Sequence, residues 1–222
     1  KVSFADIEIS VSLEGLTEAE KAWLLDDSNL DAFSVASETL KYSNKASKQN
    51  YWLSNHLTIN QKSLNDGWIT FLQCHNQLDP VPKIEVAYHP KNIKSLEVIN
   101  FMNIETVYVK AHSVELLNVA ANGKVCIKGE SKTLKANKEG FQLKRGPYMR
   151  KFLDGYYPMI VEETIEMNKL KTRLLEQSPQ LKKEIYVNNA TKVEEEGVEK
   201  MVYQFNYAFE GQLKPMYKFG IK

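Results

Sequence analysis

The sequence has few of the residues from which recognisable reaction centres are built. Among 222 residues it has two cysteines, four histidines and three arginines. No HxH, HExxH or CxxC spacing is present, so we expect no dedicated metal site and no cofactor. The glycine-rich loops that bind nucleotides and the GxSxG turn of many hydrolases are also missing. These absences leave no motif that assigns an enzymatic reaction.

Charge and hydropathy argue against nucleic acid and membranes as partners. The formal net charge is +1, so no strong global field would draw nucleic acid or an anionic membrane to the chain. No apolar run approaches the eighteen or so residues of a membrane span. The hydrophobic fraction of 43% and charged fraction of 26% are typical of a globular protein. We therefore treat residues 1–222 as one domain, with 15–50 as a helical attachment and 51–222 as a β body.

The two cysteines bear on the question of which cellular compartment holds the protein. The sequence begins with Lys1 instead of Met, which is compatible with a removed signal peptide or lipoprotein anchor, or with an arbitrary start. After export the protein would be periplasmic or secreted, and a cytoplasmic location is the alternative. In an oxidising compartment we expect a disulfide between Cys74 and Cys126. Closing a loop of about fifty residues would stabilise the fold by about 4 kcal/mol at most.

The pattern of apolar residues changes its period at Tyr51. Before it, a strand is indicated over 4–11, a short helix near Glu18 and a weaker helical pattern over 30–40. From Tyr51 onward, short alternating segments follow one another, separated by turn signals such as Asn122-Gly123. This rhythm predicts a mainly β fold, an antiparallel β-sandwich or flattened barrel with one or two short N-terminal helices.

The last two alternating segments carry their apolar residues at odd positions, over 201–209 and over 213–221. If they form a hairpin, a three-residue loop at 210–212 or a bulge is needed to bring both rows to one face, because a one-residue shift flips every side chain. This register pairs Phe205 with Tyr217 and Tyr203 with Phe219.

The segment RGPYMRKFLDGYYPM, residues 145–159, gathers two of the three arginines and three tyrosines. Its glycine and proline turn signals predict an irregular connector, and connectors of this length often bind ligands. The candidate binding residues in this segment are Arg145, Tyr148, Arg150, Asp154, Tyr156 and Tyr157. In this interpretation the two arginines face an anionic ligand and the tyrosines line its pocket. In the structural alternative Arg150 pairs with Asp154 and the tyrosines close the end of the β body.

A second stretch, LQCHNQLDPVP at 72–82, adds His75 and Asp79 to the candidate site. Cys74 and His75 are adjacent, and adjacent side chains on a strand point to opposite faces, so the two cannot form a catalytic dyad with each other. Carboxylates are harder to dismiss, because Asp79, Asp154, Glu162, Glu163 and Glu166 could place two acids across a groove, as glycosidases require. Glu162 and Glu166 fall on one face of a strand and Glu163 on the other.

The stretches GPYMRKFLDGYYPM and LQCHNQLDPVP resemble a group of exported Gram-negative proteins over roughly residues 50–220. The resemblance implies an envelope location and implies no activity, because none is attached to that group. We therefore favour a non-enzymatic envelope protein that binds a small molecule or another envelope component through residues 145–157. A carboxylate-dependent hydrolase of a glycan or ester, and an assembly protein that adds a partner to a strand edge, are the alternatives. The sequence leaves the oligomeric state open.

Overall fold

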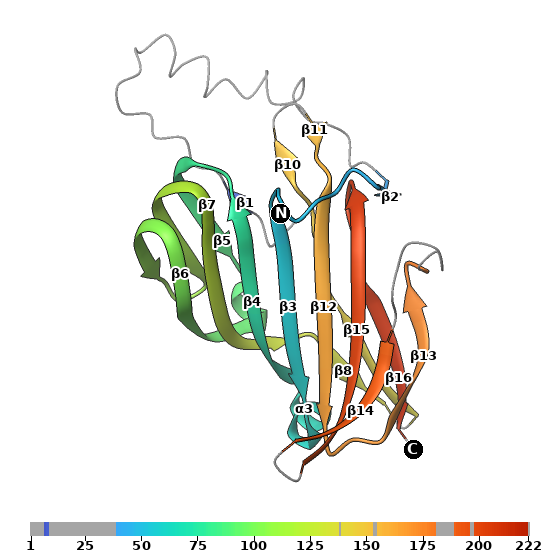
Figure 1. Ribbon diagram of the computed structural model, residues 1–222. Coiled ribbons are helices and arrows are strands. Elements are labelled where there is room, and N and C mark those ends of the chain that lie inside the picture. The colour runs from blue at the N-terminus through green and yellow to red at the C-terminus, as the bar shows by residue number, and fades with distance from the viewer. Residues whose placement is uncertain are drawn as a thin grey trace, which may run out of the picture.

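The computed structural model describes residues 7–8, 39–137, 139–152, 155–180, 189–195 and 198–221. Figure 1 shows long strands standing side by side, with a second group of strands behind and beside them. The elements are β1 (Ile7–Glu8), β2 (Lys41–Tyr42), β3 (Trp52–Ile59), α3 (Gln61–Asp66), β4 (Trp68–Leu78), β5 (Val81–Ala87), the 3₁₀ turn η1 (Pro90–Asn92), β6 (Ile93–Val109), β7 (Ser113–Lys132), β8 (Leu134–Ala136), β9 (Gly140–Lys144), β10 (Lys151–Phe152), β11 (Gly155–Tyr156), β12 (Met159–Asn168), β13 (Thr172–Ser178), β14 (Asn189–Glu195), β15 (Val198–Glu210) and β16 (Met216–Ile221).

Two sheets of unequal size make up the fold. The larger sheet has ten strands in the order β1-β5-β7-β4-β3-β12-β15-β14, with β2 added to β15 and β6 added to β7. The smaller sheet has four strands in the order β13-β16-β9-β8, and β10 and β11 form a separate two-stranded pair. β12 runs parallel to β3 and antiparallel to β15, so the larger sheet is mixed. The predicted mainly β fold, of sandwich type, is confirmed.

Strict alternation of buried and half-buried residues explains why the two sheets pack together. Along β12 every odd position from Met159 to Met167 is buried, and every even position is partly exposed. β3 and β15 show the same period of two, which gives the larger sheet one apolar face. Each large side chain buried on this face contributes about 1.5–3 kcal/mol relative to its exposed state.

The expected C-terminal hairpin is wrong, although the two side-chain contacts predicted from it are present. β15 pairs with β12, β14 and β2 in the larger sheet, whereas β16 pairs with β13 and β9 in the smaller one. Phe205 and Tyr217 meet across the two layers with ring centroids 4.3 Å apart, and Tyr203 meets Phe219 at 5.0 Å. The residues between the strands therefore carry the chain from one sheet to the other instead of making a tight turn.

One other strand boundary also differs from the sequence prediction. The chain does not turn at Asn122-Gly123, because β7 continues through this dipeptide for 20 residues. Asn122 has a φ of 60°, in the left-handed region that asparagine tolerates, and the resulting irregularity bends the strand. On one side of this bend β7 pairs with β5 and on the other with β4.

The N-terminal prediction falls largely on residues outside the described ranges. Both expected helices lie there, and the described residues 39–50 contain β2 and turns. The helix α3 was not predicted. The Asn60 side chain caps its first turn by accepting from the backbone of Lys62 and Ser63, and Gly67 ends it with a φ of 78°. In the described part of the chain, no helix has the length and apolar character that a membrane crossing requires.

Candidate functional site

A cavity of about 510 Å³ lies between the inner face of the larger sheet and the segment 145–151. Its walls come mainly from β3, β4 and β5, from the residues around η1, and from the irregular segment that precedes β10. Most of the lining is apolar, including Leu53, Phe71, Leu78, Val81, Ile84, Val86, Ile93 and Met159. The volume and character are those of a small-molecule pocket.

The unequal size of the two sheets explains where the cavity lies. The smaller sheet packs its aromatic rings against β15, as the contact between Phe205 and Tyr217 shows. In Figure 1, β13 and β16 lie beside β14 and β15, on the side away from β6 and β7. The inner faces of β4 and β5 are thus closed by a segment without long strands, which leaves a space that side chains do not fill.

Backbone hydrogen bonds fix the segment 145–151 over this space. The N–H of Arg145 donates to the Pro215 carbonyl at 2.9 Å. Tyr148 and Leu213 exchange a reciprocal pair of hydrogen bonds at 2.8 and 2.9 Å. Gly146 lies between them with a φ of 74°, and a Cβ atom there would come within 2.6 Å of the Leu213 carbonyl oxygen. Only glycine fits this close approach without displacing the backbone.

Polar side chains form a connected row along the cavity wall. The Tyr51 hydroxyl lies 2.9 Å from His75 Nδ1, and His75 Nε2 lies 3.2 Å from Gln73 Oε1. Gln73 Oε1 also accepts from the Tyr88 hydroxyl at 2.9 Å. Burial lowers the pKa of His75 to about 4 and raises that of Tyr51. His75 is therefore neutral near pH 7, with Nδ1 accepting from Tyr51 and Nε2–H donating to Gln73.

The row continues in one direction from the cavity wall into the core. Gln73 Nε2 donates to Asn55 Oδ1 at 2.9 Å, and Asn55 Nδ2 donates to the Tyr148 hydroxyl at 3.2 Å. The Tyr148 hydroxyl in turn donates to Glu163 Oε1 at 2.7 Å. Each donor thus points toward Glu163, an arrangement that strengthens every bond in the series when the last acceptor is a carboxylate.

Glu163 is the buried end of this network. Its side chain has no exposed surface, and its second oxygen accepts from the Tyr217 hydroxyl. Arg145 Nε lies 3.5 Å from Glu163 Oε1, and the Arg145 side chain is 9% exposed. Although burial acts to lower it, the neighbouring Tyr148 and Glu163 raise the pKa of Arg145. Burial, and then the charge of Glu163, raise the pKa of Tyr217 well above its usual value.

A second ion pair lies at the rim of the cavity. Arg150 Nη2 donates to both oxygens of Asp79, at 3.0 and 3.1 Å. The Asp79 side chain is 44% exposed, so solvent screens the pair and its contribution to stability is at most about 1 kcal/mol. Arg150 also lies over the Tyr157 ring, 5.6 Å from its centroid. The contact joins the 145–151 segment to the loop between β4 and β5.

The structure brings together five of the eight candidate binding residues. His75, Asp79, Arg145, Tyr148 and Arg150 all line the cavity. Tyr156 and Tyr157 lie outside the lining: the Tyr156 hydroxyl accepts from Gln212, and Tyr157 packs beside Arg150. Asp154 lies outside the described residues. Arg150 pairs with Asp79, and the pairing with Asp154 expected in the structural alternative lies outside the described residues.

Sequence reasoning missed Tyr51, Gln73, Tyr88 and Glu163 as members of this site. A usable signal was present, because Asn55, Gln73 and Glu163 each occupy a buried-face position of an otherwise apolar row. Polar groups on such a face are rare unless they are hydrogen-bonded to one another. Glu163 was separated correctly from Glu162 and Glu166, but its face was not recognised as the buried one.

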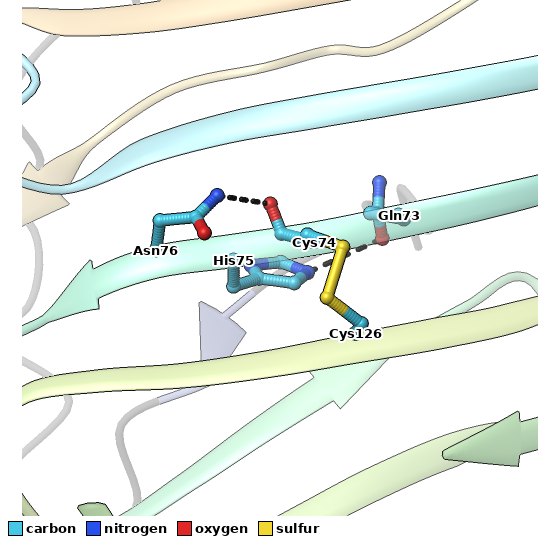
Figure 2. The surroundings of a disulfide bond; sticks show 5 residues. All are labelled: Gln73, Cys74, His75, Asn76 and Cys126. Carbon is cyan, nitrogen blue, oxygen red and sulfur yellow. Dashed lines mark hydrogen bonds between the residues drawn. A yellow bond between two sulfur atoms is a disulfide. The ribbon is translucent and has the colours of Figure 1, made fainter. Parts of the chain in front are cut away.

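The disulfide between Cys74 and Cys126 is confirmed. Figure 2 shows it joining β4 to β7, where the two cysteines are directly paired across neighbouring strands. His75 lines the cavity and Cys74 does not, so the two adjacent side chains point to opposite faces of β4, as the sequence indicated. Among the described residues, no cluster of three or more histidine, cysteine or acidic side chains is arranged to hold a metal ion.

Comparison with known proteins gives only a distant likeness. No family model and no curated protein matches the chain. Among solved structures, an M1 zinc metallopeptidase from Deinococcus radiodurans is 10% identical, with a TM-score of 0.42 over 82% of this chain. A point mutant of that peptidase gives 10% identity and a TM-score of 0.43 over 78% of this chain. In both cases the chain spans 42% of the peptidase. At this level the likeness carries no argument about activity.

Proposed function

We propose that this protein binds a small, largely apolar molecule in the cavity beneath residues 145–151, without changing it chemically. The observation that carries the proposal is a cavity of about 510 Å³ whose lining is mostly apolar, with a few polar groups held in fixed positions. Ligand pockets combine these two features, since the apolar area supplies affinity and the polar groups supply orientation. The envelope setting remains a proposal supported by the disulfide, because such bonds persist in oxidising compartments.

Binding is favoured over hydrolysis by the arrangement of the side chains at the cavity. Both ring nitrogens of His75 are engaged, by Tyr51 and Gln73, so this histidine is poorly placed to activate a nucleophile. Of the described acids, Asp79 alone lines the cavity, while Glu163 lies behind Tyr148. A carboxylate-dependent hydrolase would need two acids facing one bond. Glu162 and Glu166 pair instead with Lys48 and Lys200.

The edge strand β6 supports an assembly function less strongly than the cavity supports ligand binding. β6 is 17 residues long and, in the described part of the chain, pairs with β7 alone. Ile99, Phe101 and Met102 on it are about half exposed. However, its register with β7 shifts at three places. Such bulges are a device by which proteins prevent edge-to-edge pairing.

A cavity-filling substitution tests the proposed function. Val86 is buried in the cavity wall, whereas Leu72 lies on the outer face of β4 and is 37% exposed. Calorimetric titration with decanol should show binding to the wild type and to Leu72→Trp. Val86→Trp should bind at least about tenfold more weakly, because the indole occupies space that the ligand needs. Equal affinity in all three folded proteins would show that the molecule binds elsewhere.

A further inference from the structure

The chemical class of the ligand can be narrowed from the charges at the cavity, and this step rests on the proposed function. We infer that the ligand is an apolar molecule with a single acid group, and that Arg145 holds this group. Arg150, which the sequence singled out equally, has a structural role instead: its ion pair with Asp79 connects the segment 145–151 to the β4–β5 loop.

The two arginines differ in what already occupies them. A guanidinium offers five N–H donors in a planar fork. Arg150 spends part of its fork on both oxygens of Asp79, at 3.0 and 3.1 Å, and also contacts the Tyr157 ring. Arg145 contacts Glu163 through Nε, at 3.5 Å, and also interacts with the Tyr148 side chain. Its terminal nitrogens are therefore the stronger candidates for a bidentate bond to an acid.

Arg145 is also the more rigidly held of the two. Its backbone N–H is bonded to Pro215, and the residue that follows it is the constrained Gly146. Glu163 is held in turn by Tyr148 and Tyr217, so the carboxylate beside Arg145 cannot easily move away. A cation fixed in this way is preorganised for an anion, because little side-chain freedom is lost when the ligand binds.

The charged groups around the cavity indicate the charge of the ligand. Arg145 pairs with Glu163 and Arg150 pairs with Asp79, and Lys151 lines the cavity beside them. Three cations and two anions therefore give the site one net positive charge. Since charges in a largely apolar site are more stable when they are balanced, one further negative charge is the best match.

A series of three probes with the same alkyl chain tests this inference. Decanoate carries one negative charge, decanol carries none, and decyl phosphate carries nearly two at neutral pH. Wild-type protein should bind decanoate at least about tenfold more tightly than decanol, because a charge-assisted hydrogen bond to Arg145 is added. It should also bind decanoate more tightly than decyl phosphate.

Two variants test the roles of Arg145 and Arg150 separately. Removing Arg145 alone would leave Glu163 buried without its counter-charge, so we combine Arg145→Met with Glu163→Gln. The glutamine keeps an acceptor for one of the Tyr148 and Tyr217 hydroxyls and offers the other hydroxyl an N–H donor. In this double variant the preference for decanoate should fall to nearly one, while decanol still binds. In Arg150→Gln the preference should persist.

The outcomes distinguish the two levels of the proposal. Loss of the preference in Arg150→Gln, with its retention in the double variant, would overturn the assignment to Arg145. Equal binding of decanoate and decanol by the wild type, or tighter binding of decyl phosphate, would overturn the acid class and leave the cavity as a binding site. Failure of all three probes to bind the wild type would remove the proposed function and this inference together.

Discussion

At the scale of single residues, Glu163 is the point on which the buried polar network converges. It accepts from Tyr148 and Tyr217 and lies beside Arg145, with no surface exposed to water. An isolated carboxylate in this position would be very costly, so its partners are required for the fold as well as for the cavity. The same network fixes the tautomer of His75 and the position of Tyr148 at the cavity wall.

Replacing Glu163 should therefore destabilise the protein strongly. Glu163→Leu leaves Arg145 buried without a counter-charge and removes the acceptor for two hydroxyls, which should cost about 3–5 kcal/mol in urea unfolding. Glu162 offers a matched control on the same strand, because its pair with Lys48 is partly exposed. Glu162→Leu should cost less than about 1 kcal/mol. Similar losses in the two variants would contradict the assigned role of Glu163.

His75 should make stability depend on pH on the acid side. Its pKa is about 4 in the folded state and 6.5 ordinarily, so between these values the unfolded chain binds a proton that the folded protein does not. Stability then falls as the pH is lowered from about 6.5 to 4, by up to about 3 kcal/mol. His75→Gln should lack this component. Unfolding free energies of both proteins at a series of pH values test it, and parallel curves would refute the contribution.

At the scale of the elements, the sequence predicted which face of a strand each side chain occupies better than it predicted which strands pair. The alternation over 201–209 and 213–221 correctly placed Phe205 against Tyr217. It could not show that β15 and β16 belong to different sheets, because a period of two fixes the face of a side chain and says nothing of the neighbouring strand. The same reason explains β7, where an asparagine and a glycine bend one long strand instead of ending it.

The candidate site was predicted in part for a similar reason. Turn chemistry and the scarcity of arginine pointed to the 145–157 segment, of which 145–151 borders the cavity, and His75 and Asp79 came from the unusual composition of 72–82. Tyr51 and Tyr88 could not be found in this way, because tyrosines in strands are common and their meeting at Gln73 and His75 depends on the packing of separate strands. Glu163 could have been recognised as buried, because it occupies one position in a row of otherwise apolar alternating residues.

The disulfide between β4 and β7 should affect stability without affecting the cavity. The combined variant Cys74→Ala and Cys126→Ala opens a loop with a sequence separation of 52. It should lose up to about 4 kcal/mol of stability, because the unfolded chain gains freedom. Affinity for decanol should be unchanged, since Cys74 lies on the face of β4 opposite His75. Loss of binding by a folded double variant would contradict this separation of roles.

At the scale of the whole molecule, the cavity follows from a mismatch between the two sheets. Ten strands form one layer and four form the other, so the smaller layer cannot cover the whole inner face of the larger. The segment 145–151 closes the remainder, and it carries two arginines and a tyrosine into an otherwise apolar space. Fold and site are thus linked, because a complete second layer would have filled the volume that a ligand can occupy.

A crystal structure of the wild-type protein grown with decanoate is the most direct test of this account. We expect the alkyl chain in the cavity between Phe71 and Met159, with the carboxylate within hydrogen-bonding distance of Arg145 and the contact between Arg150 and Asp79 retained. A cavity closed by rearranged side chains, with decanoate absent or bound on another surface, would contradict the central claim that this space is a ligand site.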